Sequence, residues 1–127
     1  MKQIKRQLTP VILALFLIGC ATVQTGNDTA VVDAERTTNV AYEAINSFLQ
    51  IEYQNKTWVK ANAPQIHTYA NTLRLHAKQW KDSAIALIDT YKTNRSATNK
   101  ANFQTAIAVL TQAMYQAQQY QSQIGAH

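Results

Sequence analysis

The apolar residues in the second half of this 127-residue chain recur in alternating steps of three and four. That spacing places them on one face of an α-helix and is typical of helices packed along a near-parallel seam. The chain also contains only three Gly and two Pro, which leaves few turns. Both features favour a few long helices over a β-sandwich. The clearest run consists of Ile66, Tyr69, Ala70, Leu73, Ala77, Trp80, Ala84, Leu87, Ile88 and Tyr91.

Two further segments carry helical apolar stripes. The first begins near Asn27 or Asp33 and is interrupted at Asn55, and the last follows a polar turn at residues 94–99. Asn62 and Pro64 predict a stop and a restart, because Asn caps helices and Pro suits a first helical turn. The first stripe consists of Ala41, Ala44, Ile45, Phe48, Ile51, Trp58 and Val59, and the last of Phe103, Ile107, Leu110, Met114, Ala117 and Ile124.

Short connections make neighbouring helices antiparallel. Residues 28–127 are therefore expected to form an all-α, up-down-up antiparallel three-helix bundle. At the centres of the stripes we expect Leu73, Trp80 and Leu110 to face the core.

The first twenty residues have the organisation of a secretory signal. Three basic residues (Lys2, Lys5 and Arg6) precede an apolar run at residues 11–18. A membrane-spanning helix needs about twenty apolar residues, so this run is too short to span and has the length of a signal-peptide core. The run closes on Leu17-Ile18-Gly19-Cys20, and Cys20 is the only cysteine in the chain.

Leu17-Ile18-Gly19-Cys20 resembles the lipobox of bacterial lipoproteins. The resemblance implies thioether-linked diacylglycerol on Cys20, cleavage between Gly19 and Cys20, and in many bacteria a further acyl chain, such as palmitate, on the new amine. Residues 1–19 would then be a cleaved signal peptide and residues 20–27 a lipidated tether. A lone thiol agrees with this interpretation, because an exported protein with one cysteine has no disulfide partner for it.

The tether would hold the following domain within about 25 Å of the membrane. In Gram-negative sorting, a residue other than Asp after the lipidated cysteine favours the outer membrane. Ala21 occupies that position. We therefore expect a lipid-anchored protein on the periplasmic face of the outer membrane, if the host is Gram-negative.

The formal net charge of +5 does not indicate nucleic-acid binding. Three of the basic residues lie in the segment expected to be removed, and the remainder has nine Lys and Arg against seven Asp and Glu. A net charge near +2 is an ordinary solvated surface. No nucleic-acid partner is expected.

Candidate chemical groups are sparse. His67 and His76 lie nine positions apart, on opposite sides of one helix, and cannot bind one metal ion together. Asp82 and Asp89 share a face, but Lys78 and Lys92 stand at ion-pairing offsets from them, which indicates a salt-bridged surface. No Ser or Cys nucleophile accompanies a base, and no glycine-rich phosphate loop occurs. We expect no enzymatic activity, no metal, and no cofactor besides the lipid on Cys20.

One flank of the second helix is basic. It consists of His67, Arg74, Lys78, Lys81 and Lys92. One interpretation is a charged boundary between core and solvent. The other is contact with anionic lipid headgroups or lipopolysaccharide.

The last helix contains no Lys, Arg, Asp or Glu from Ala101 to Ala126. Surface helices usually carry charge for solubility, whereas protein interfaces are depleted of charge and enriched in Tyr. The outward face is either simply neutral or a docking surface. For the second case the expected partner-binding residues are Ala108, Gln112, Tyr115 and Gln119.

Two functions remain open from the sequence. The first is a membrane-anchored, non-catalytic protein-interaction module of the cell envelope, which binds a protein partner or a second copy of itself through the last helix. The alternative is an envelope structural or surface-exclusion (superinfection-exclusion) lipoprotein that alters an outer-membrane receptor.

Overall fold

The structure is a computed structural model that describes residues 29–127. Four α-helices account for nearly all of this segment, and it contains no strand, so the prediction of an all-α fold is confirmed. They are α2 (Thr29–Gln54), α3 (Lys56–Asn62), α4 (Pro64–Thr93) and α5 (Ala97–Gly125). The predicted signal peptide, the predicted tether and the lipobox residues Leu17, Ile18, Gly19 and Cys20 lie outside the described residues.

The chain divides into two units, Met1–Asp33 and Ala34–His127. Of the first unit the structure describes only residues 29–33, which form the opening of α2. The second unit contains the rest of α2 and the other three helices, and the packing below is described within it.

The expected first helix is in fact two helices, α2 and α3, separated at Asn55. The Asn55 side-chain amide donates a hydrogen bond to the Ile51 carbonyl at 2.8 Å. Its backbone N–H is shared between the carbonyls of Ile51 and Glu52, at 3.1 and 3.2 Å. An Asn side chain that competes for a helix carbonyl in this way weakens the regular ladder. The interruption in the apolar stripe therefore coincides with a real break.

The helix ends are partly as expected. Pro64 occupies the first turn of α4, but Asn62 does not cap that helix. The residue before α4 is Ala63, whereas Asn62 ends α3 and donates its side-chain amide to the Trp58 carbonyl at 3.0 Å. At the polar turn before α5, the Ser96 hydroxyl accepts the Asn99 backbone N–H at 3.1 Å and caps the helix.

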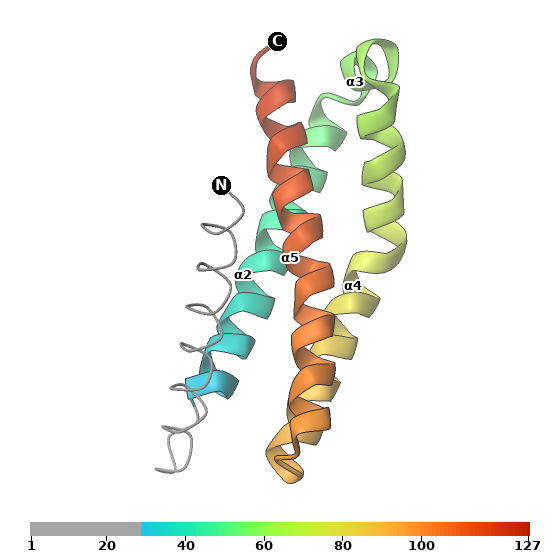
Figure 1. The fold of residues 1–127 in the computed structure, drawn as a ribbon. Coiled ribbons are helices and arrows are strands. Elements are labelled where there is room, and N and C mark those ends of the chain that lie inside the picture. The colour runs from blue at the N-terminus through green and yellow to red at the C-terminus, as the bar shows by residue number, and fades with distance from the viewer. Residues whose placement is uncertain (1–28) are drawn as a thin grey trace, which may run out of the picture. The chain divides into compact units, whose positions relative to one another are not determined.

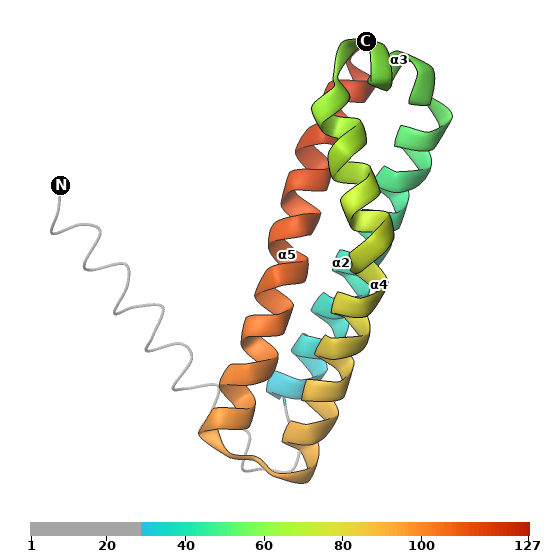
Figure 2. The same cartoon turned by 90° about the vertical axis from the view of Figure 1, so that its right-hand side faces the viewer.

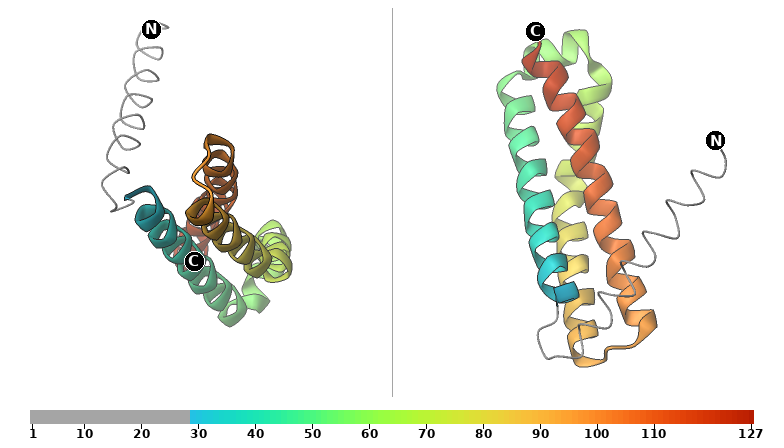
Figure 3. Two further views of the ribbon diagram at one scale, coloured as in Figure 1. Left: turned by 90° about the horizontal axis from the view of Figure 1, so that it is seen from below. Right: turned by 60° about the vertical axis from the view of Figure 1, so that its left-hand side comes forward.

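The three long helices lie side by side within the Ala34–His127 unit (Figures 1 and 2). In the contacts between α2 and α4, residue numbers increase along α2 as they decrease along α4. The pairs are Glu35 with Lys92, Tyr42 with Lys81, and Phe48 with Tyr69. Contacts between α4 and α5 follow the same rule, since Tyr91 meets Phe103 and Tyr69 meets Tyr120. Figure 3 shows these helices from one end and from a further side.

Helices α4 and α5 approach each other at many positions. Ala70, Ala77 and Ala84 recur every seven residues on α4 and are buried, and Ala113 and Ala117 are buried on α5. Side chains of this size let two helix backbones come close together, and the short repeat keeps them close over several turns. Small side chains are therefore part of the core on both α4 and α5.

The predicted stripes form the core with a small rotation. Leu73 and Leu110 are buried as expected, whereas Trp80 is only partly buried and stacks on His76 at a centroid distance of 5.7 Å. The expectation that Trp80 faces the centre of the core is therefore wrong. Ala113, which the predicted stripe of the last helix did not include, is buried. The core cluster consists of Ala41, Ile45, Phe48, Val59, Ala63, Ile66, Ala70, Leu73, Ala77, Ala84, Leu110, Ala113, Ala117 and Ile124.

A matched pair of leucines on α4 tests this packing. Leu73 is 1% exposed and Leu75 is 77% exposed. Leu73→Ala should lower the free energy of unfolding by about 2–5 kcal/mol, because it removes buried methyl groups and leaves a cavity. Leu75→Ala makes the same chemical change in water and should leave stability almost unchanged. Urea denaturation followed by circular dichroism measures both, and equal losses would mean that α4 is turned differently from the structure.

Candidate functional site

The four residues predicted to bind a partner lie together on the outer side of α5. Ala108, Gln112, Tyr115 and Gln119 are all exposed, and Tyr115 retains 58% of its accessible surface. Their exposure agrees with the expected orientation of the helix. Whether this face binds a partner stays a prediction.

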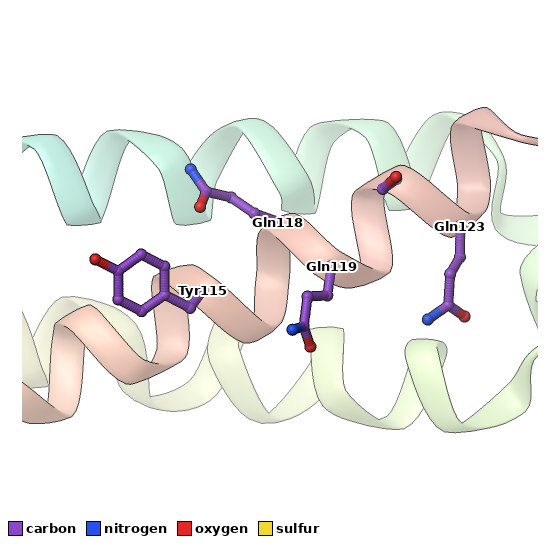
Figure 4. Close-up of a pocket in the computed structure, with 5 residues that line it drawn as sticks. Tyr115, Gln118, Gln119 and Gln123 are labelled. Carbon is purple, nitrogen blue, oxygen red and sulfur yellow. The ribbon is translucent and has the colours of Figure 1, made fainter. Parts of the chain in front are cut away.

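A shallow surface depression continues along the same helix. It is lined by Tyr115, Gln118, Gln119, Ser122 and Gln123, all of which come from α5 (Figure 4). A depression formed by one helix is open to solvent, so it offers a surface for another macromolecule and does not enclose a small ligand. The amide groups can each donate and accept hydrogen bonds, and the tyrosine ring supplies apolar area.

A buried polar cluster between α2 and α4 was not predicted. At its centre is Glu52, the only fully buried acidic side chain in residues 29–127, with 0% exposure. One carboxylate oxygen accepts a hydrogen bond from His67 Nδ1 at 2.7 Å. The other accepts a hydrogen bond from Arg74 Nη2 at 2.5 Å. A buried carboxylate is tolerated only when it is paired and hydrogen-bonded in this way.

The cluster closes into a ring of hydrogen bonds. Arg74 Nη1 donates to the Asn71 side-chain oxygen at 3.0 Å, and the Asn71 amide lies 3.4 Å from His67 Nε2. With the proton of His67 on Nδ1, this imidazole donates to Glu52 and accepts from Asn71. Arg74 also donates to the Leu49 carbonyl at 3.2 Å. Positions 67, 71 and 74 share one helix face, so α4 presents three polar groups to a single carboxylate of α2.

The electrostatic balance of this cluster favours the charged carboxylate. Burial by itself raises the pKa of Glu52, but the hydrogen bonds from His67 and Arg74 more than offset it, and the pKa lies below its ordinary value. Glu52 is therefore ionised at neutral pH and holds α2 against α4.

A sequence signal for Glu52 did exist. The stripe Ala41, Ile45, Phe48 proceeds in steps of four and three, and a further step of four reaches Glu52. The sequence interpretation instead continued the stripe through Ile51 and placed its interruption at Asn55, so Glu52 was passed over. The spacing along the stripe predicts burial better than polarity does. Thr38, which lies one step of three before Ala41, is also polar and buried, and its hydroxyl donates to the Ala34 carbonyl at 2.8 Å.

The basic flank of α4 is engaged by side chains of the same molecule. Lys78 pairs with Asp82 at 2.7 Å, and Lys92 lies 2.6 Å from Glu35. The predicted pairing of Lys92 with Asp89 is also present, at 3.6 Å. Lys81 lies over the Tyr42 ring at 4.7 Å, and Arg74 and His67 are bound to Glu52. These contacts favour a charged boundary between core and solvent over a headgroup-binding surface.

The described helices contain no group of three His, Cys, Asp or Glu side chains arranged to hold a metal ion. Among them, none combines the length and apolar character needed to cross a membrane. Comparisons of the chain with protein-family models, curated proteins and solved structures gave no match.

The Glu52 cluster predicts a pH dependence. A carboxyl group whose pKa is lower in the folded state stabilises the fold above its unfolded pKa, about 4.3, and that contribution is lost as the pH falls through the folded value. Glu52→Gln should cost about 1–3 kcal/mol at pH 7, as for other hydrogen bonds to charged groups. The gap between the two proteins should narrow as the pH falls below about 4.

Urea denaturation at pH 7 and pH 3 measures this gap. Asp82→Asn is the control, because its pair with Lys78 is exposed and should contribute little at either pH. A gap of the same size at both pH values would contradict the assignment of an ionised, ion-paired Glu52.

Proposed function

We propose that this chain is a membrane-anchored helical lipoprotein that acts as a non-catalytic protein-interaction module in the cell envelope. The observation that carries the proposal is the exposed, charge-free outer face of α5 with Tyr115 at its middle. Interfaces are enriched in Tyr and depleted of charge at their cores.

The finer architecture in this proposal is an up-down-up antiparallel bundle on a short tether. Helices α2 and α3 together form its first arm, and α4 and α5 form the other two. The tether is residues 20–27, attached to the membrane through lipid on Cys20. The lipobox-like sequence Leu17-Ile18-Gly19-Cys20 supports the lipid anchor. The antiparallel arrangement is supported by the α2–α4 contacts, in which residue numbers on α4 decrease as those on α2 increase.

The proposed location is the periplasmic face of the outer membrane in a Gram-negative host. The proposed covalent modification is the lipid on Cys20, and no cofactor is proposed. The partner is a protein that binds Ala108, Gln112, Tyr115 and Gln119. The alternative function is an envelope structural or surface-exclusion lipoprotein, whose partner would be an outer-membrane receptor.

The anchor is tested at its only thiol. Cys20→Ser should abolish incorporation of labelled palmitate, because the lipid has no other cysteine to join. The wild-type chain, expressed at the same level, should be labelled and should fractionate with membranes. Labelling of the variant equal to that of the wild type would overturn the lipoprotein assignment.

The interaction face is tested with a photocrosslinking amino acid at Tyr115 in living cells. Tyr53 on α2 is a matched control, since it is 64% exposed and Tyr115 is 58% exposed. Crosslinked adducts should form from position 115 and be absent or much weaker from position 53. Identification by mass spectrometry separates an envelope protein from an outer-membrane receptor. Equal or absent crosslinking at both positions would contradict a docking role for α5.

A further inference from the structure

The ring of hydrogen bonds around Glu52 admits one arrangement of protons. The ionised carboxylate of Glu52 has no proton to donate, so Nδ1 of His67, at 2.7 Å from it, must carry the hydrogen. A neutral imidazole with its proton on Nδ1 has its lone pair on Nε2. This second nitrogen lies 3.4 Å from the Asn71 amide nitrogen and accepts from it.

The orientation of the Asn71 side chain is fixed by the same reasoning. The guanidinium of Arg74 has donors only, so the Asn71 atom that it contacts at 3.0 Å must be the oxygen. The amide nitrogen of Asn71 therefore faces His67. Each of the two contacts of Asn71 thus uses one end of its amide group.

A second proton on His67 is incompatible with this closed ring. That proton would occupy Nε2 and place an N–H against the N–H of Asn71. Turning the Asn71 amide over would move the conflict to Arg74, because a guanidinium cannot accept a hydrogen bond. When His67 is doubly protonated, one of the two contacts of Asn71 must therefore break.

We propose that His67 and Asn71 form a proton-controlled switch at the contact between α2 and α4. With His67 neutral, the ring is closed and carries no net charge, because Glu52 and Arg74 cancel each other. With His67 protonated, Asn71 leaves the ring and the cluster carries one positive charge. Histidine side chains ordinarily change charge between about pH 5 and pH 8, which is the range in which to measure the switch.

The two helices stay together in both states of the switch. Nδ1 of His67 and Nη2 of Arg74 donate to Glu52 whether or not Nε2 carries a proton. The Asn71 side chain is exposed, so water can replace its lost partner. The switch therefore changes the charge and the hydrogen-bond donors at this surface and leaves the fold intact.

The charged groups around the imidazole are few. Those in the ring are Glu52 from α2 and Arg74 from α4. Helix α3, which also packs against α4, carries Lys56 and Lys60, both exposed, and Lys56 lies over the Tyr53 ring at 4.9 Å. Helix α5 carries no charge beyond its first turn. Glu52 and Arg74 are therefore the charges that an added proton meets first.

Nuclear magnetic resonance of the isotope-labelled full chain in mild detergent, from about pH 8 to pH 5, tests the switch. Neutral His67 should give the nitrogen shifts of a proton on Nδ1. The side-chain amide signals of Asn71 should move with the same pH dependence as those of His67. The control is the side-chain amide of Asn99, which donates to the Asn94 carbonyl at 2.8 Å and should not move with them. Helicity should stay constant.

Asn71→Asp tests the proton arrangement directly. The introduced carboxylate would accept from Arg74 and from a protonated Nε2 at once, so the ring could close around the charged imidazole. His67 should then take up its second proton at a higher pH than in the wild type. Thr72→Asp is the control, because it adds the same charge at the next exposed position, outside the ring, and should have a smaller effect.

Three results would overturn the switch. They are Asn71 amide signals that stay fixed while His67 titrates, a neutral His67 with its proton on Nε2, and equal effects of the two aspartate substitutions. None of these measurements depends on lipidation or on a partner, so the proposed function is tested separately.

Discussion

The packing of α5 against α4 is the contact on which the rest of the structure depends. Aromatic rings meet across it, Tyr69 with Tyr120 and Tyr91 with Phe103, and the Tyr69 hydroxyl donates to the Ala113 carbonyl at 3.4 Å. Ala113 is buried in this packing. The opposite side of α5 is left in solvent, and that side carries Tyr115 and no charged residue.

The contact between α2 and α4 has a different character, because it includes a buried carboxylate. Apolar side chains pack without a strong directional preference, whereas the hydrogen bonds from His67 and Arg74 to Glu52 require one relative position. A shift of α4 by one helical turn, about 5.4 Å, would leave Glu52 buried without partners. Removing one partner of a buried charge is strongly destabilising, so the cluster specifies the register between these two helices.

The distribution of charge connects the fold with the proposed function. The basic residues of α4 are bound to Glu52, Asp82, Glu35 and the Tyr42 ring, so the mixed charges of α2 and α4 largely satisfy one another. The outer face of α5 has no such role in the described unit. The packing of the core does not require this face to be uncharged, and this is the physical reason for proposing that it contacts another molecule.

The sequence by itself determined the features that depend on neighbours a few residues apart. These include the all-α fold, the apolar stripes, the polar turn before α5, and the ion pair between Lys78 and Asp82. It also indicated which side of α5 faces solvent, because a regular stripe defines its own opposite face. Residues three and four positions apart lie on the same face of a helix, regardless of which elements pack around it.

Only the tertiary structure decided the features that depend on which helix lies opposite. The burial of Glu52 requires His67 and Arg74, which are 15 and 22 residues away in sequence. Trp80 lies at the edge of the core, partly buried and stacked on His76, which its place in the stripe did not reveal. The energy of a buried charge or a bulky ring is set by its surroundings, and those exist only once the helices have packed.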